Sequence, residues 1–293
     1  MKPMVTIFTP TYNRESYLGK LFESLKNQTN HDFKWLIIDD GSTDKTEEVV
    51  KTFYDSSNFE IEYIKKENGG KHTALNLAFK MIESDYTFIV DSDDTLTSDA
   101  VQLIYDNDAI VKENNLAGMC FLKGYDEKTV IGTPFPQNGI FNDIELRYGE
   151  NVIGDKTEIW RTDILKKYEF PVFEGERFQG ENYVWWKIAF EYDMLYINKI
   201  VYLAEYLSDG LSKSGKKLRI SCPLGGMENS KVGFSKRFPL KERIKRAWLF
   251  VCYGFFAKMS VIEIVKKSEN WKLIVPNLIF GWLVYIYWNK KYN

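Results

Sequence analysis

The sequence predicts an α/β fold with a mostly parallel central sheet and helices on both faces. Three observations support this. Short runs of apolar and β-branched residues alternate with segments of helical spacing over the first 120 residues. The apolar runs are continuous, which is typical of parallel strands covered on both faces. Each run ends in a polar cluster, as expected where a strand passes into a crossover helix.

The expected elements follow in order along the chain. Strands are expected at residues 4–8, 33–38, 61–64 and 86–90. Helical spacing lies between them, at residues 16–28, 42–53 and 72–82, with Ser42 and Thr43 as helix caps. Beyond these, we expect a strand at residues 119–122, a helix at 181–192 and a polar, basic loop at 208–219.

The C-terminal part differs in charge from the rest of the chain. Residues 1–210 carry 22 Lys and Arg against 37 Asp and Glu, a net charge of −15. Residues 211–293 carry 17 against 4, a net charge of +13. Two uncharged, aromatic-rich stretches at 247–257 and 273–288 have basic flanks and are too short to span a bilayer. This pattern predicts amphipathic helices in peripheral contact with an anionic membrane, with two helices packed on the core as the alternative.

Other features narrow the compartment and the partners. The aromatic residues of the basic region lie inside apolar runs, so nucleic acid is not an expected partner. The three cysteines, Cys120, Cys222 and Cys252, are widely spaced and predict neither a disulfide framework nor a zinc site. The N-terminal apolar run is too short for a secretory signal. We therefore expect a cytoplasmic protein that is peripheral to the inner face of the cell membrane.

Four polar clusters follow the first four expected strands, at residues 9–13, 39–40, 68–72 and 91–94. A parallel sheet places them at one edge, where ligands bind. No Gly-rich loop of the kind that cradles phosphate follows the first strand, so a bound diphosphate would need another source of positive charge. Carboxylates such as Asp91, Asp93 and Asp94 prefer hard cations like Mg²⁺ or Mn²⁺. Taken alone, Asp91-Ser92-Asp93 is more often an acidic turn that caps the next helix.

The clusters in this order resemble the signature of family 2 glycosyltransferases, which have the GT-A fold and use nucleotide sugars. The resemblance is strong from residue 4 to about residue 100 and weaker to about 212. It implies a GT-A domain at 1–212, with a nucleotide-binding half at 1–100 and an acceptor-binding half at 101–212. A basic loop and amphipathic helices would follow at 213–293. The motifs that carry the resemblance are Thr9–Arg14, Ile37–Asp44, Asn68–Asn76 and Asp91–Asp94.

The resemblance also implies roles in binding the donor. Residues Pro10, Thr11 and Tyr12 would line the base and ribose of the nucleotide. Asp40 would accept a hydrogen bond from the base, typically uracil. Lys71 would contact the nucleotide or its phosphates. His72 and Asn76 would either face the same pocket or only begin a helix.

The acidic triplet would hold the diphosphate and the sugar. Asp91 would reach the ribose or the sugar, with Ser92 beside it. Asp93 would bind Mn²⁺ or Mg²⁺ on the diphosphate, where the ion acts as a Lewis acid on the leaving group. The triplet is thus expected to bind the donor and not to move the proton.

Inverting transfer also needs a general base to take the proton of the acceptor hydroxyl. The Glu-Asp pair that often serves the family corresponds here to Glu181 and Asn182, and an asparagine cannot act as a base. Glu181 is the expected base, with Glu174 and Glu176 as alternatives. Of the two following tryptophans, Trp185 and Trp186, one would form an acceptor platform or both would be buried.

These expectations together describe an inverting, metal-dependent glycosyltransferase. It would move a sugar from a nucleotide sugar, expected to be a UDP-sugar, to a hydroxyl of a glycan or lipid-linked acceptor in surface polysaccharide biosynthesis. A sugar nucleotidyltransferase is disfavoured because Pro10 and Thr11 stand where its Gly-rich loop would be. The alternative from another class is a catalytically silent subunit that binds a sugar nucleotide or a glycan, which Asn182 supports.

Overall fold

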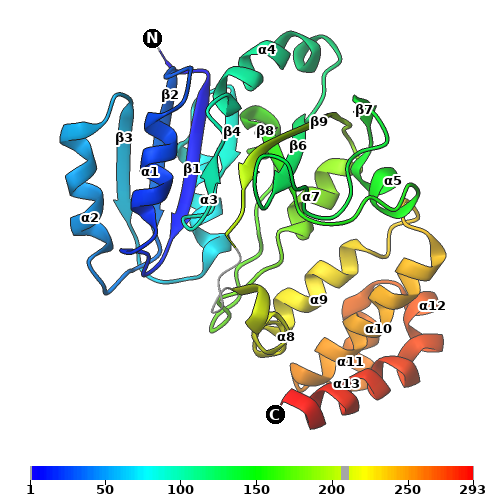
Figure 1. Ribbon diagram of the computed structural model, residues 1–293. Coiled ribbons are helices and arrows are strands. Elements are labelled where there is room, and N and C mark those ends of the chain that lie inside the picture. The colour runs from blue at the N-terminus through cyan, green and yellow to red at the C-terminus, as the bar shows by residue number, and fades with distance from the viewer. Residues whose placement is uncertain (1, 206–210, 293) are drawn as a thin grey trace. The chain divides into compact units, whose positions relative to one another are not determined.

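A computed structural model describes residues 2–205 and 211–292, with side chains from residue 215 onward in the second range. Two compact units make up the chain (Figure 1). The first consists of Met1–Glu169 and Glu191–Tyr206, and the second of Phe170–Phe190 and Leu207–Asn293. The chain therefore passes between the units three times. The domain boundary expected after residue 212 stays a prediction.

The first unit is built on one sheet, which has nine strands in the described part of the chain. Their order is β3-β2-β1-β4-β8-β6-β9-β5, and β7 pairs with β9. The strands are β1 Val5–Thr11, β2 Phe33–Asp39, β3 Glu60–Lys65, β4 Tyr86–Ile89, β5 Thr95–Leu96, β6 Gly118–Gly124, β7 Gly139–Phe141, β8 Lys156–Arg161 and β9 Met194–Leu203.

The sheet is mixed, which corrects the expectation of a mostly parallel one. Strands β3, β2, β1 and β4 run parallel, as expected. Beyond them, β8 lies antiparallel between β4 and β6, and β5 and β7 are antiparallel to β9. Only β6 and β9 are parallel there. The first half has the strand-helix rhythm of crossover connections, whereas the later strands lack it and can reverse direction.

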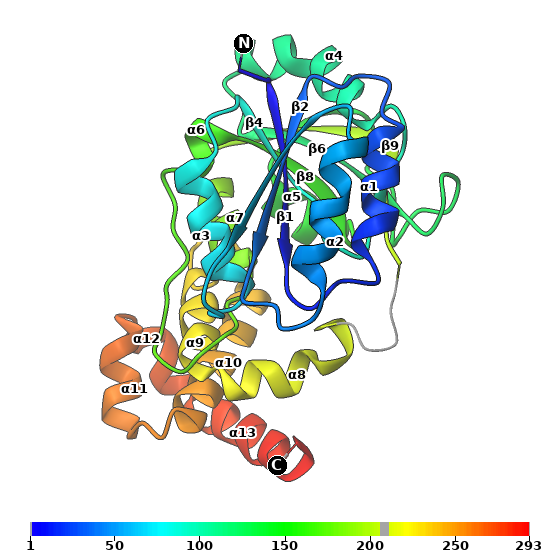
Figure 2. The same cartoon turned by 90° about the vertical axis from the view of Figure 1, so that its left-hand side faces the viewer.

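Helices cover both faces of the parallel half of the sheet. Figure 2 shows α1 and α2 on one side of β1 and β2, and α3 on the other. Helix α1 buries Leu18, Leu21, Phe22 and Leu25, which is one face at helical spacing. The described helices of this unit are α1 Leu18–Lys26, α2 Thr46–Phe53, the 3₁₀ turn η1 Tyr54–Ser56, α3 Lys71–Met81, α4 Ala100–Glu113, α5 Asp143–Tyr148 and α6 Thr162–Leu165.

The core of the first unit fixes where the strands end. Every residue of β1 is buried, and Trp35 of β2 has no exposed surface. On one face of the sheet, the ring of Phe22 stacks on that of Phe53 with centroids 4.2 Å apart. Because both faces of these strands are covered, the sheet is open to a ligand only at its ends.

The second unit is helical. Its own core gathers Met227, Phe250, Val251 and Ile264. No helix in residues 2–205 and 211–292 is both long and apolar enough to cross a membrane. The described helices are α7 Asn182–Ala189, α8 Leu211–Ser221, α9 Pro223–Val232, α10 Leu240–Phe256, α11 Val261–Ser268, α12 Trp271–Ile274, the 3₁₀ turn η2 Val275–Asn277 and α13 Leu278–Tyr292.

One expectation for this unit is wrong. The basic loop expected at residues 208–219 is helical from Leu211 onward, as α8; residues 208–210 lie outside the described part of the chain. Lys and Leu favour helix, and the one glycine within α8, Gly215, has open space around it. The ring of Phe178 lies 6.0 Å from the guanidinium of Arg219. Closure of the basic residues of α8 over the donor phosphates stays a prediction.

Candidate functional site

The expected polar clusters do meet at one edge of the sheet. Thr11 at the end of β1 pairs with Asp39 at the end of β2, and Asp39 pairs with Lys65 at the end of β3. Val90, just past β4, donates its backbone N–H to the carbonyl of Phe8 in β1. Each loop that follows therefore starts from the same edge of the same unit.

The first two loops are joined through Asn13. This residue has a positive φ of 52°, a conformation that asparagine tolerates better than most residues. Its backbone N–H donates to Ser42 Oγ at 2.8 Å. Its side-chain oxygen accepts from the backbone N–H of Thr43, also at 2.8 Å. These bonds hold the segment before Asn13 in place.

That segment contains the residues expected to line the base and ribose. Pro10 and Thr11 end β1 and are buried. The hydroxyl of Thr11 has no hydrogen-bond partner among the described residues. The ring of Tyr12 is 45% exposed. Of the three, only Tyr12 offers a large accessible surface, and an aromatic ring at this place can stack on a flat heterocycle.

Asp40 holds the third loop. Its Oδ1 atom accepts from the backbone N–H of Gly69 at 2.9 Å, and Oδ2 accepts from that of Gly70 at 2.7 Å. Lys66 Nζ lies 2.6 Å from Oδ1. Both carboxylate oxygens of this buried side chain are thus engaged within the protein. The contacts assign Asp40 an anchoring role, and its expected hydrogen bond to the base stays a prediction.

Lys71 begins α3 directly after Gly70, whose φ is +93°. Its Nζ lies 2.6 Å from Asp91 Oδ1. The two side chains are about one-third exposed, at 31% and 38%. Burial opposes ionisation of Asp91, but Lys71 and Lys123 together hold the pKa of this carboxyl below its usual range. The geometry brings two predicted donor residues into one ion pair.

Residues from a later strand complete this loop. The backbone N–H of Asp91 donates to the hydroxyl of Tyr202 in β9 at 2.9 Å, and the same hydroxyl is bonded to Asp94. Lys123 Nζ of β6 lies 4.0 Å from the centre of the Tyr202 ring. Sequence reasoning did not single out Tyr202, Lys123 or Lys66. Lys66 adjoins a motif, but Tyr202 and Lys123 carry no local signal because only the sheet register brings them here.

Asp91 is paired with Lys71, whereas Asp93 forms no ion pair within the described part of the chain. Burial, and then the neighbouring charge of Asp91, raise its pKa above the usual range for aspartate. The pKa of Asp94 is raised to about 6, again by burial first and Asp91 second. Ser92 is also buried. Three carboxylates this close together repel one another when they are ionised, and a bound cation at this edge would reduce the repulsion.

The residues present fit a divalent cation that the substrate helps to bind. The described residues contain no set of three or more His, Cys, Asp or Glu side chains arranged around one point. Mg²⁺ in nucleotide sites is usually held by one or two carboxylates, with water and substrate phosphates as the other ligands. Asp93 offers one carboxylate of this kind beside Asp91, and its expected role as the ligand of Mn²⁺ or Mg²⁺ stays a prediction.

His72 and Asn76 lie in the first two turns of α3 and are buried. Burial, with a smaller contribution from Lys66, lowers the pKa of His72, although Asp40 acts in the opposite direction. Its Nδ1 atom has no partner among the described residues. The imidazole is therefore neutral at physiological pH. Both side chains belong to the interior that supports the third loop.

The three glutamates considered as the base lie in the second unit. Glu181 is the N-cap residue of α7 and is partly buried. Glu176 accepts from the backbone N–H groups of Leu224 and Gly225, at 2.7 and 2.8 Å. It therefore caps α9, which satisfies donors that a helix start leaves unpaired. Glu174 is exposed. These contacts make Glu176 a structural residue.

The two tryptophans after Glu181 differ in surroundings. Trp186 is buried and packs against Phe238, with ring centroids 5.1 Å apart. The guanidinium of Arg246 lies 4.5 Å from its ring centre. Trp185 is partly buried against Phe170. Trp186 thus belongs to the core of the second unit, and only Trp185 has surface to offer an acceptor.

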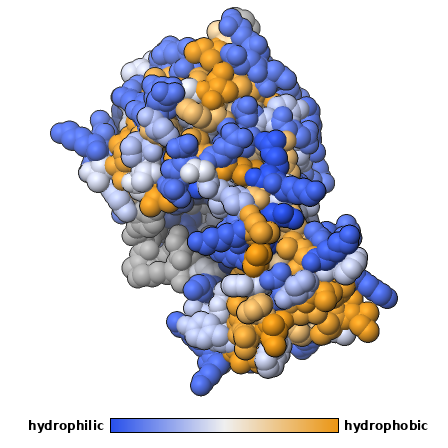
Figure 3. All heavy atoms as spheres, turned by 90° about the vertical axis from the view of Figure 1, so that its right-hand side faces the viewer, coloured by the Kyte–Doolittle hydropathy of each residue, from blue (hydrophilic) through white to orange (hydrophobic). Residues whose placement is uncertain are grey.

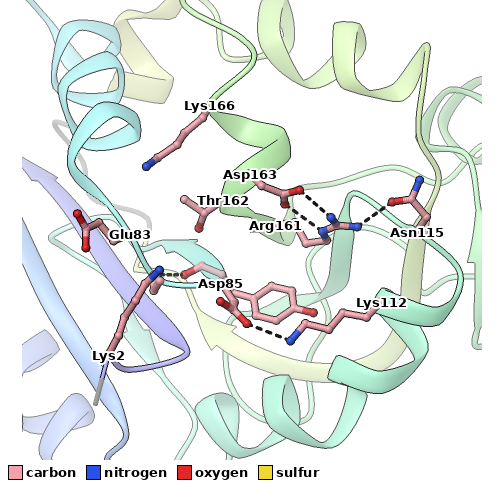
Figure 4. A pocket seen from close by; sticks show the side chains of 11 residues that line it. Lys2, Glu83, Asp85, Lys112, Asn115, Arg161, Thr162, Asp163 and Lys166 are labelled. Carbon is pink, nitrogen blue, oxygen red and sulfur yellow. Dashed lines mark hydrogen bonds and ion pairs between the residues drawn. The ribbon is translucent and has the colours of Figure 1, made fainter.

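A pocket of about 580 Å³ lies elsewhere in the first unit. It contains Tyr86, the first residue of β4, so it is at the opposite edge of the sheet from the polar loops. Figure 4 shows its charged lining, in which Arg161 pairs with Asp163 and Lys112 with Asp85. Each of these two pairs is neutral, and the pocket lies apart from the polar loops described above.

Comparison with known proteins decides the family. The sequence model of the family described as "Glycosyl transferase family 2" matches residues 6–158, which is more than half of the chain. The chain belongs to glycosyl transferase family 2. The matched range contains all four polar loops of the sheet edge, and it ends before the second unit begins.

Several curated proteins are similar to this chain over part of its length. GlyA of Streptococcus pneumoniae is 36% identical over 101 residues, which cover 34% of this chain and 14% of GlyA. A chondroitin synthase of Pasteurella multocida is 40% identical over 101 residues, or 34% and 10%. A teichoic acid poly(glycerol phosphate) polymerase of Staphylococcus epidermidis is 29% identical over 207 residues, or 67% and 27%. The chain spans less than a third of the length of each.

Solved structures of glycosyltransferases share the fold. Residues 1–349 of Staphylococcus aureus TarS, in complex with UDP, align with a TM-score of 0.57 at 19% identity, covering 94% of this chain and 88% of that one. The mannosyltransferase PcManGT of Pyrobaculum calidifontis, in complex with GDP-Man and Mn²⁺, aligns with a TM-score of 0.58 at 16% identity, covering 99% and 88%. The expected GT-A-like α/β fold is therefore confirmed.

Proposed function

We propose that this glycosyltransferase moves a sugar from a UDP-sugar to a hydroxyl of a glycan or lipid-linked acceptor, with inversion, in surface polysaccharide biosynthesis. The observation that carries the proposal is the Lys71–Asp91 ion pair beside Asp93, a carboxyl whose pKa is raised. This edge of the sheet therefore presents the positive charge of Lys71 and a carboxylate, Asp93, whose negative charge a bound cation would stabilise. In a nucleotide diphosphate bound with a divalent cation, the phosphates would pair with Lys71 and the cation would pair with Asp93.

The donor would lie along the four loops. Tyr12 stacks on the base, with Pro10, Thr11 and Asp40 around the base and ribose. Lys71 contacts the phosphates, and Asp91 and Ser92 face the ribose and the sugar. A UDP-sugar is supported by the similar structure of TarS, which has been solved with UDP and with UDP-GlcNAc. PcManGT has been solved with GDP-Man instead, so binding experiments should compare UDP with GDP.

Asp93 would hold Mn²⁺ or Mg²⁺ against the diphosphate. When bound, such an ion supplies Lewis-acid stabilisation of the leaving phosphate oxygens. Lys71 adds a fixed positive charge on the same side. In this proposal the protein orients Asp93 through the loop that carries it. The backbone N–H of Asp91 fixes that loop by donating a hydrogen bond to the hydroxyl of Tyr202. PcManGT with Mn²⁺ supports a metal of this kind.

The proposed chemistry is a single displacement. The acceptor oxygen attacks the anomeric carbon, and the bond from that carbon to the diphosphate oxygen breaks, so that the nucleoside diphosphate leaves with the electron pair. The carboxylate of Glu181 takes the proton of the acceptor hydroxyl. One displacement inverts the anomeric carbon. Glu181 is preferred because Glu176 is committed to the start of α9.

The acceptor and location complete the proposal. We retain residues 1–100 as the nucleotide-binding half and 101–212 as the acceptor-binding half, followed by the C-terminal extension. Two similar proteins are named for polymer synthesis, a chondroitin synthase and a teichoic acid poly(glycerol phosphate) polymerase, which supports a glycan or lipid-linked acceptor. The enzyme would then work in the cytoplasm, peripheral to the inner face of the cell membrane.

Two variants test this mechanism. Glu181→Gln should lower the rate of UDP release in the presence of acceptor by about 10²-fold or more, because the base is lost, while calorimetric titration finds donor affinity unchanged. Glu174→Gln is the control and also tests the remaining alternative base: this glutamate is exposed, and its variant should retain full turnover if Glu181 is the base. Turnover by Glu181→Gln equal to that of the control would remove Glu181 from the mechanism.

A silent binding subunit is the second candidate. Asn182, in place of the aspartate often found in the family, favours it. This candidate predicts donor binding by the wild-type protein without sugar transfer to any of a panel of glycan and lipid-linked acceptors. Mass-spectrometric detection of one glycosylated product, lost in Asp93→Ala, would exclude it.

A further inference from the structure

The second unit carries an apolar surface that its own core does not use. We call it the C-terminal apolar face and define it by Trp271, Ile279, Trp282, Leu283, Ile286 and Tyr287. Each of these large side chains is between 44% and 61% exposed. Figure 3 shows hydrophobic side chains gathered over the C-terminal helices, with hydrophilic ones at the margin. A contiguous patch of this kind marks an interaction surface.

Helix α13 is apolar on two opposite sides. One side, with Gly281 fully buried, faces α10. On the other side, Ile279, Leu283 and Ile286 follow helical spacing and are 61%, 51% and 44% exposed. A surface helix normally has a polar outer face. The outer face of α13 therefore has the composition of a surface that meets a second apolar phase.

Packing against α10 presents this face in a fixed orientation. A Cβ atom added to Gly281 would lie 2.4 Å from Cβ of Val251, so the two helices approach too closely for any larger residue. At the start of α13, Trp248 Nε1 donates to Asn277 Oδ1 at 2.7 Å. Near its end, the rings of Trp288 and Tyr253 pack edge to face. The apolar face is thus preformed and needs no folding upon binding.

The charges around the face are of one sign. Residues 258–293 contain six lysines and two glutamates. Glu263 is engaged in the capping box of α11 with Ser260, and Glu269 pairs with Lys231 at 2.7 Å. Lys272, Lys290 and Lys291 are exposed on or beside the helices that carry the face. Within residues 2–205 and 211–292, these three lysines form no ion pair, so the margin presents their positive charge.

We propose that the C-terminal apolar face inserts into the headgroup region of an anionic lipid bilayer, with α13 lying in the plane of the membrane. Trp and Tyr favour this depth, and the lysines would contact anionic headgroups. A second copy of the chain is a poorer fit, because a symmetric contact would bring the lysine margins together. The inference specifies the surface behind the proposed membrane location and does not depend on sugar transfer.

Vesicle cosedimentation of the full chain tests the inference. We expect binding to vesicles of phosphatidylglycerol and phosphatidylcholine, and little to pure phosphatidylcholine. Ile279→Ser/Leu283→Ser/Ile286→Ser should reduce the partition coefficient at least tenfold or so, because apolar area is lost. Lys272→Gln/Lys290→Gln/Lys291→Gln should reduce it roughly fivefold per lysine at low salt.

The control variant makes the same kind of substitution, exposed apolar residues to serine, in the first unit. Ile110→Ser/Ile140→Ser/Ile153→Ser changes three isoleucines that are 41%, 41% and 60% exposed there, and should leave vesicle binding intact. Circular dichroism melting verifies that each variant folds, and light scattering reports its oligomeric state. The proposal is overturned if wild type ignores anionic vesicles, if control and test variants bind alike, or if the test variant instead dissociates a dimer.

Discussion

Asp94 is the residue whose ionisation is most costly at the donor edge. Its carboxylate accepts from the backbone N–H of Glu205 at 2.9 Å and from the hydroxyl of Tyr202. Burial and the charge of Asp91 nevertheless raise its pKa to about 6, from an ordinary 3.8. The folded state therefore holds a proton on Asp94 that the unfolded state releases between these two values. Stability falls as pH rises through this window.

We therefore expect Asp94→Asn to stabilise the protein near neutral pH. The gain should be about 1–2 kcal/mol at about pH 7.5 after the weakened bond to Tyr202 is counted, and should vanish at about pH 4. The measurement is the melting temperature across this pH range in buffer with EDTA. A destabilised variant at neutral pH would show that the buried charge is compensated, contrary to its raised pKa.

Lys71 gives a second prediction at this scale. Lys71→Met removes the cation that stabilises Asp91 and, in the proposal, contacts the phosphates, so affinity for UDP with Mn²⁺ should fall about tenfold or more. Lys80→Met is the matched control, because Lys80 lies on the same helix and forms an exposed pair with Glu169. Calorimetric titration compares the two. Equal affinities would mean that Lys71 serves only the fold.

Single residues show where sequence reasoning reaches its limit. Asp91 and Asp93 were identified because they follow a strand directly, and a parallel sheet gathers such positions at one edge. Tyr202 and Lys123 could not be identified from the sequence, since their position beside Asp91 depends on the pairing of β5 and β6 with β9. Asp40 was found, but the bonds of Gly69 and Gly70 to it follow from loop conformation, which the motif does not encode.

The start of α3 shows how an element depends on one backbone conformation. Gly70 has φ +93°, and its N–H donates to Asp40. Gly70→Ala should destabilise the protein by about 1–3 kcal/mol, because an L side chain is strained there. Gly19→Ala in α1, where no atom lies within 4 Å of an added Cβ, should be neutral or stabilising by up to about 1 kcal/mol. Denaturant titration measures both.

Outcomes for this pair are distinguishable. If Gly70→Ala also weakens UDP binding while Gly19→Ala does not, the loop that Asp40 anchors is part of the donor site. Unchanged stability of Gly70→Ala would instead show that the loop adopts another conformation at no cost.

At the level of elements, the first half of the sheet was predictable and the second was not. Strands β1 to β4 are apolar runs bounded by turn signals, and each lies within a few residues of its expected range. Strand β8 places the charged residues Lys156, Glu158 and Arg161 among apolar ones, so its pattern is weak. Strand β9 follows α7 with few turn residues between. The mixed topology follows from these two strands.

For the whole molecule, donor binding should raise the free energy of unfolding, which can be followed as a rise in the melting temperature. UDP with Mn²⁺ at about 100 times its dissociation constant adds about 2.7 kcal/mol, which should raise the melting temperature by about 4–5 °C for a chain of this length. EDTA in place of Mn²⁺, or Asp93→Ala, should abolish most of the rise. An equal shift with EDTA would remove the metal from the proposal and leave nucleotide binding in place.

The division into two units has a consequence for how the chain is made. Helix α7 belongs to the second unit but emerges from the ribosome well before Phe238 and the α10 residue Arg246, against which Trp186 packs. The sheet up to β9 can assemble while α7 still lacks its partners. During synthesis, the apolar side of α7 is thus a transient target for chaperones, and a chain that stalls before α10 leaves it uncovered.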